Sequence, residues 1–92
     1  MIALVTYTCR PGMAREFVDA VRAEGLQEVI RLEDGCMQYD YHLSLENPDV
    51  VLLLERWGNT KLQEKHMAQP HMERMRELKA KYVLESKLEK YQ

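Results

Sequence analysis

The first third of the chain shows two different spacings of hydrophobic residues. Residues 2–9 are mostly β-branched, aliphatic and aromatic, which predicts a strand. Arg10-Pro11-Gly12 then supplies the chemistry of a turn. Between Met13 and Leu32 hydrophobic residues recur every three or four positions, which predicts an amphipathic helix of about five turns. Gly25 is unfavourable inside a helix, so we expect a bend there. The recurring positions are Phe17, Ala20, Val21, Glu24, Val29 and Leu32, all hydrophobic except Glu24.

Two further strands are predicted after Gly35, which suits the left-handed end of a helix. Residues 36–45 alternate in polarity and predict a second strand, and residues 46–49 form a tight turn. Residues 50–57 predict a third strand, antiparallel to the second. Its unbroken hydrophobic start indicates that both of its faces are covered. In the second strand we expect Met37, Tyr39, Tyr41 and Leu43 on one face and Gln38, Asp40 and His42 on the other.

The last third of the chain predicts two short helices and a final strand. Thr60 is expected to cap a helix that ends near Ala68. Pro70 suits the first turn of the next helix, which carries Met72, Met75 and Leu78 on one face. Residues 82–92 have helical propensity, but a strand is favoured because a sheet of three strands would leave an edge without a partner.

The order of the elements, β-α-β-β-α-β, defines an α+β fold with a four-stranded antiparallel sheet in the ferredoxin-like arrangement. We expect one domain over residues 1–92. Both helical segments should pack on one face of the sheet. The opposite face is then hydrophobic and uncovered, which predicts a symmetric homodimer packed sheet to sheet.

Composition excludes several classes of partner. The net charge is -2 and both signs are mixed along the chain, so a nucleic-acid binder is not expected. No hydrophobic run approaches the roughly 20 residues that span a membrane, and the first residues do not resemble a signal peptide. The two cysteines do not form a disulfide framework. These features predict a protein of the reducing cytoplasm.

Candidate chemistry concentrates in one segment. The only Trp and two of the three His lie between Glu55 and His71. A strand ending in Glu55-Arg56-Trp57 and a following helix with His66 can form the floor and wall of a small-molecule pocket. His66 is the candidate general base, because the ordinary pKa of histidine is near neutral. A His near a helix C-terminus that interacts with free carbonyl groups is the simpler structural interpretation.

The remaining candidates have structural interpretations of similar weight. Glu55 and Trp57 share a sheet face, so Glu55 can orient His66, and Trp57 is either core or a surface against which an aromatic ligand stacks. A Tyr39 hydroxyl can bind a ligand oxygen, although core tyrosines are commoner. Met67, Met72 and Met75 can fill the core or a cavity wall. His71 at the start of a helix is more readily explained by structure.

No metal site is predicted. His71 follows His66 by five positions with a proline between them, so the two do not share a helix face, and no Cys or carboxylate joins them at the spacing of metal ligands.

These residues resemble a known family. Gly35-Cys36-x-x-Tyr39, Glu55-x-Trp57 and the series Leu62, His66, Pro70 and His71 resemble the antibiotic biosynthesis monooxygenase family, and its quinol-monooxygenase-like branch above all. The resemblance implies a ferredoxin-like fold that pairs into a dimeric α/β barrel, with a substrate cavity between sheet and helices. It also implies oxidation of quinol-like aromatics by molecular oxygen without metal, flavin or haem.

Three functions therefore remain open. The first is a cofactor-independent monooxygenase acting on a quinol or similar phenolic, with His66 and Trp57 as catalytic residues. Its other substrate contacts would be Tyr39, Glu55, Met67, His71 and Met75. The second is an acid–base isomerase of a small phosphorylated metabolite, and the third is a non-enzymatic dimeric ligand-binding module. A cavity walled by Met, Leu and Trp would favour the first, and a cavity with two or more cations, drawn from Lys61, Lys65 and Arg74, would favour the second.

Overall fold

The computed structural model describes residues 1–92 and contains four strands and four helices. No helix is long and hydrophobic enough to cross a membrane. In chain order the elements are β1 (Ile2–Cys9), α1 (Ala14–Ala23), α2 (Leu26–Arg31), β2 (Cys36–Leu43), β3 (Val50–Trp57), α3 (Thr60–Met67), α4 (Met72–Tyr82) and β4 (Val83–Tyr91).

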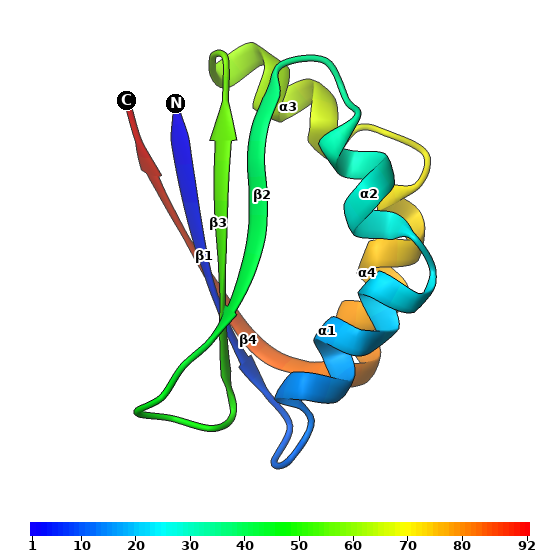
Figure 1. The fold of residues 1–92 in the computed structure, drawn as a ribbon, viewed down its shortest axis with the longest axis vertical. Coiled ribbons are helices and arrows are strands. Elements are labelled where there is room, and N and C mark those ends of the chain that lie inside the picture. Colours follow the sequence, from blue (N-terminus) through cyan, green and yellow to red (C-terminus); the bar gives the residue numbers. More distant parts are fainter.

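The strands form one antiparallel sheet in the order β2-β3-β1-β4. All the helices lie on the same side of it, and the two chain termini lie close together on neighbouring strands (Figure 1). This arrangement confirms the predicted α+β ferredoxin-like fold. It also confirms the final strand, which pairs with β1 along most of its length.

The long first helix was predicted to bend at Gly25, and it breaks there instead. Gly25 adopts a positive φ of 71°, a left-handed conformation that ends α1 and restarts the chain as α2. The restart changes the angular phase of the helix, so the buried positions become Leu26, Gln27 and Ile30. Val29 and Leu32 were expected on the hydrophobic face and are exposed, Leu32 to 87 %.

Two local predictions need correction. Met37 was placed on the same face of the second strand as Tyr39, which is buried, but a bulge between Cys36 and Gln38 leaves Met37 without a cross-strand partner and 66 % exposed. Thr60 was expected to cap the third helix, but Asn59 does so, because its side chain accepts a hydrogen bond from the backbone N–H of Leu62 at 2.9 Å.

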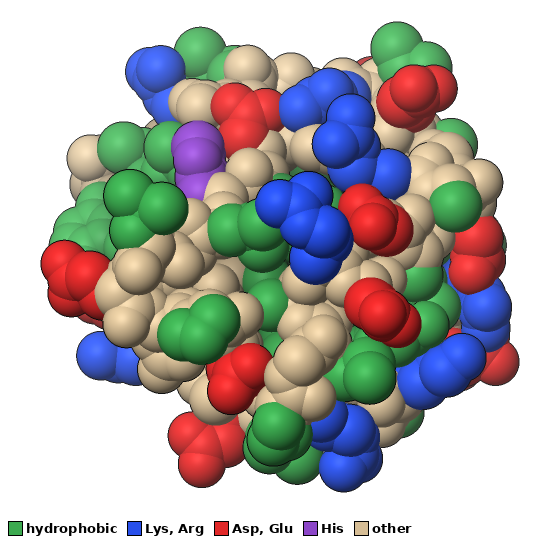
Figure 2. Space-filling model, turned by 60° about the horizontal axis from the view of Figure 1, so that its bottom comes forward, with side chains coloured by type: hydrophobic (Ala, Val, Ile, Leu, Met, Phe, Trp, Pro, Cys, Tyr) green, Lys and Arg blue, Asp and Glu red, His purple; other side chains and the backbone are tan.

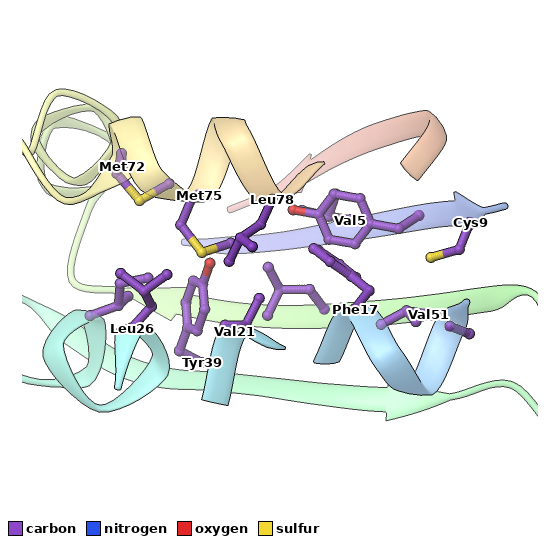
Figure 3. Packing of buried hydrophobic residues seen from close by; sticks show 14 of the residues in the cluster. Val5, Cys9, Phe17, Val21, Leu26, Tyr39, Val51, Met72, Met75 and Leu78 are labelled. Atoms are coloured by element: carbon purple, nitrogen blue, oxygen red, sulfur yellow. The ribbon is translucent and has the colours of Figure 1, made fainter. Parts of the chain in front are cut away.

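The core lies between the sheet and the helices, in a cluster of 15 buried hydrophobic residues. Met72, Met75 and Leu78 contribute from one side of α4, as their spacing predicts, and Phe17 and Val21 contribute from α1 (Figure 3). Phe17 packs its ring edge-on against Tyr7 of β1, with 5.4 Å between ring centroids. The core therefore fixes α1 and α4 over the central strands.

The face of the sheet away from the helices is hydrophobic along its centre. Leu54 lies opposite Leu4, and Leu52 opposite Thr6, across the β1–β3 pair. These residues are half-buried, because no element of the chain covers them. The prediction that both faces of the third strand are covered therefore does not hold within one chain. The end of the molecule that carries the β2–β3 turn mixes hydrophobic, acidic and basic side chains without a patch of one charge (Figure 2).

Candidate functional site

A cavity of about 150 Å³ lies between the sheet and helices α3 and α4. Every strand contributes to its wall, and its composition is divided between hydrophobic and polar side chains. Its lining residues are Val5, Tyr7, Tyr39, Glu55, Gln63, His66, Met67, Met72, Lys79, Ser86 and Leu88. Ser86 and Leu88 of the edge strand β4 are exposed, so the cavity opens at this edge of the sheet.

His66 occupies the centre of this site. Asn59 starts α3 so that Gln63, His66 and Met67 follow at the three- and four-residue spacing of one helix face. The imidazole is 1 % exposed and lies over the Trp57 indole, with 4.6 Å between ring centroids and 31° between planes. The Tyr39 ring approaches it edge-on at 5.6 Å. Trp57 and Tyr39 together hold the imidazole in one orientation.

Glu33 lies behind His66 and joins it to His71. Nδ1 of His66 is 3.0 Å from both carboxylate oxygens of Glu33, and Nε2 of His71 is 2.7 Å from Oε2. A carboxylate only accepts hydrogen bonds, so both histidine nitrogens carry protons. Neutral His66 then has its lone pair on Nε2, the atom that lies 4.0 Å from the cavity residue Glu55.

The loop that carries Glu33 is held against α3 by close packing. Gly35 has a positive φ of 77°, and the side chain of Leu62 occupies the space where a Cβ would stand. A residue with a side chain would have to displace Leu62 or move the loop, and would be strained at this positive φ. The glycine therefore lets Glu33 reach His66.

Glu55 presents a buried carboxyl group to the cavity. Its Oε1 accepts a hydrogen bond from the Trp57 indole N–H at 2.9 Å. Burial raises the pKa of Glu55, although the indole hydrogen bond, His66 and Lys79 oppose this effect. The carboxyl group fixes the indole beneath His66.

Lys79 of α4 is the only cation among the lining residues. Its ammonium lies 5.5 Å from the centroid of the Tyr7 ring and has no carboxylate within ion-pair distance. Burial lowers the pKa of Lys79, and the nearby charge of Glu55 acts in the opposite direction. Lys79 can therefore interact with negative charge on a ligand.

The structure brings four of the seven residues singled out from the sequence to this cavity: Tyr39, Glu55, His66 and Met67. The other three do not line it. Trp57 lies behind His66, His71 binds Glu33, and Met75 is fully buried in the core. Sequence reasoning missed Glu33, Gln63 and Lys79. Only Gln63 carried a signal, its position one helical turn before His66.

The cations considered for a phosphate site lie elsewhere. Lys65 pairs with Asp34 at 3.0 Å and Arg74 pairs with Glu24 at 2.6 Å, both on the surface. Neither of them, nor Lys61, lines the cavity. The cavity therefore lacks the pair of cations that a phosphorylated ligand would need.

Substituting Glu55 by Gln is expected to stabilise the protein at neutral pH. Because the pKa of Glu55 is raised in the folded state, its ionised form opposes folding above that pKa, and the cost disappears below about pH 4, where the carboxyl is protonated in both states. The amide oxygen of Gln can still accept the hydrogen bond from the Trp57 indole N–H.

Urea unfolding should give Glu55→Gln a higher midpoint than the wild type at pH 8 and an equal midpoint at pH 3.5. Exposed Glu64→Gln is the control, and equal midpoints for Glu55→Gln and the wild type at pH 8 would contradict the prediction.

Comparison with known proteins agrees with this architecture. A Pseudomonas aeruginosa protein shares 26 % identity, with a TM-score of 0.83 over 99 % of this chain and 91 % of that one. A conserved Methanosarcina mazei protein shares 25 % identity, with a TM-score of 0.84 over 99 % and 90 %. A Nitrosomonas europaea protein described as an antibiotic biosynthesis monooxygenase shares 23 % identity, with a TM-score of 0.87 over 98 % of this chain and 86 % of that one.

The family assignment rests on the sequence as well as on the fold. The chain matches no curated protein. The family model described as antibiotic biosynthesis monooxygenase matches residues 1–78, which include every helix but the last turn of α4 and all strands except β4. The chain belongs to the antibiotic biosynthesis monooxygenase family.

Proposed function

We propose that the protein is a cofactor-independent monooxygenase that oxidises a single-ring quinol or similar phenolic with molecular oxygen. The observation that carries the proposal is the hydrogen-bonded pair of Glu33 and His66, which leaves Nε2 of a buried imidazole unprotonated beside the cavity. An imidazole held in this way is a suitable general base for a phenolic proton.

The proposed reaction begins when His66 Nε2 takes the proton from a ring hydroxyl. The resulting phenolate is electron-rich and transfers electrons to oxygen, and a carbon–oxygen bond forms on the ring. Loss of water then gives a hydroxyquinone. One oxygen atom enters the product and the other leaves as water, and the quinol supplies both electrons and both protons that the water needs. No external reductant is required.

Two further features of the cavity support this chemistry. The ammonium of Lys79 can stabilise the negative charge that develops on the phenolate. The volume of about 150 Å³ matches that of engineered cavities that hold benzene. A single aromatic ring therefore fits against Val5, Met67 and Met72.

The isomerase alternative has less support. A phosphorylated ligand carries about two negative charges, and Lys79 is the only cation in a cavity that also contains Glu55. A ligand-binding module without turnover would not need the Glu33–His66 pair. The monooxygenase therefore uses more of the observed geometry than either alternative.

The test is oxygen uptake with single-ring hydroquinones, corrected for autoxidation, followed by mass spectrometry of the product formed under ¹⁸O₂. Enzyme-dependent uptake of one O₂ per quinol, with one labelled oxygen in the product, is the expected result. Uptake equal to buffer would remove quinols as substrates. A quinone without the label, formed together with hydrogen peroxide, would identify an oxidase instead.

We also propose that the protein acts as a homodimer in which two sheets pack face to face. The hydrophobic centre of the uncovered face supports this. Leu54→Glu would place a charge at that centre and is expected to give a monomer by light scattering, against a dimer of about twice 10.9 kDa for the wild type. Leu32→Glu, on an exposed helix end, should stay dimeric. A monomeric wild type or a dimeric Leu54→Glu would contradict the proposal.

A further inference from the structure

Gln63 is a buried polar residue whose hydrogen bonds are not made within the protein. Its side chain lines the cavity and is 2 % exposed, and its buried amide oxygen Oε1 has no hydrogen-bond partner. Only two buried side-chain oxygens lack a partner, those of Tyr41 and Gln63, and of the two residues only Gln63 lines the cavity. A buried polar group without a partner is unfavourable, and such groups are rare in native proteins.

Gln27 shows what this fold does with a buried glutamine that has a structural role. It is 7 % exposed, and its Nε2 donates to the backbone carbonyl of Tyr39 at 3.1 Å. That bond ties α2 to β2. Gln63 makes no comparable link, so the fold alone does not explain its polar side chain.

The position of Gln63 relative to His66 indicates that its amide can contact a ligand. The two residues are three apart on α3 and both line the cavity, so they lie on one helix face. A ligand close to His66 Nε2 is therefore also close to the amide. A hydroxyl group both donates and accepts, so it can pair with either end of an amide.

We propose that Gln63 is a ligand-binding residue whose amide hydrogen-bonds a second oxygen substituent on the ring that His66 deprotonates. The identity of that ring rests on the function proposed above. Gln63 makes the site selective for rings with two oxygen substituents over rings with one. The selectivity arises because a ligand without the second oxygen leaves the amide unpaired.

The first experiment measures binding without turnover, so that it is independent of oxygenation. Phenol, catechol, resorcinol and hydroquinone are titrated under argon, and dissociation constants are taken from NMR shifts of cavity residues. The wild type should bind at least one dihydroxybenzene about tenfold more tightly than phenol, as expected for one hydrogen bond to an otherwise unpaired group. In Gln63→Met the preference should fall to within about twofold, because methionine has nearly the same shape and no amide.

The second experiment measures stability in the absence of ligand. Gln63→Met should raise the urea midpoint, because it removes an unpaired buried polar group. The matched control Gln27→Met should lower the urea midpoint, because this substitution removes the hydrogen bond from Gln27 to the Tyr39 carbonyl. A lower midpoint for Gln63→Met would show that the amide is bonded within the fold, and would overturn the inference.

The binding results overturn the inference in two ways: a wild type without preference for any dihydroxybenzene, or a preference unchanged in Gln63→Met. A different result would exclude the proposed monooxygenase while leaving the role of Gln63 intact. A protein that binds dihydroxybenzenes through Gln63 but consumes no oxygen would keep the role of Gln63 and exclude the monooxygenase.

Discussion

Replacing His66 by Gln is expected to lower kcat/KM for quinol oxidation by about 10²–10⁴-fold, the usual contribution of a positioned general base. Gln can hydrogen-bond to Glu33 in place of Nδ1 but cannot take a proton at neutral pH. The phenol must then ionise without help. Because ring binding uses the cavity walls rather than the base, the loss should fall mainly on kcat. Oxygen uptake over a range of quinol concentrations separates the two parameters.

The third histidine supplies a matched control for this substitution. His42 is exposed on the edge strand β2, on the face of the sheet away from the cavity, so His42→Gln should leave kcat and KM unchanged in protein that light scattering shows to be dimeric. Raising the pH should restore part of the activity of His66→Gln, because more of the quinol ionises in solution. A loss of less than tenfold in His66→Gln with an unchanged urea midpoint would remove His66 as the base.

Much of the fold follows from residue periodicity. The hydrophobic runs of β1 and β3 and the spacing of Met72, Met75 and Leu78 on α4 reflect which side chains must leave water. The errors occur where one residue changes the backbone path. Gly25 resets the phase of the helix, and the bulge at Met37 shifts one position out of register. Neither event is encoded in the average polarity of the surrounding segment, so periodicity alone could not predict it.

Apart from Tyr39, the site was predictable where it is local in sequence. Glu55, Trp57 and His66 lie close together along the chain, so the strand–helix unit could be recognised as a wall of the pocket. Glu33 is 33 positions before His66, and Lys79 arrives from α4. Both reach the site through tertiary packing. A Glu before a Gly turn and a Lys on a helix are common at protein surfaces, so the local sequence does not mark either residue as part of a site. Only the structure could identify them.

Glu33→Gln is the second substitution with a large expected effect, and it tests the hydrogen bonds behind the base. Glu33 accepts from Nδ1 of His66, which keeps the lone pair of the imidazole on Nε2. A Gln amide can donate to Nδ1 instead and favour the tautomer with its proton on Nε2, which cannot accept the phenolic proton. We expect kcat/KM for quinol oxidation to fall by about 10²-fold, at the upper end of the effect of losing a partner that orients a histidine.

A purely structural role for Glu33 would give a different pattern. If Glu33 acts through the tautomer, the dissociation constants of the dihydroxybenzenes should stay the same while kcat falls. Asp34→Asn is the control. It removes the neighbouring carboxylate, which pairs with Lys65 on the surface, and should leave the dissociation constants and kcat unchanged.

Equal losses of binding and turnover in Glu33→Gln would show that Glu33 supports the loop rather than the base. An unchanged kcat would show that the orientation of His66 does not depend on Glu33, because Trp57 and Tyr39 already hold the ring.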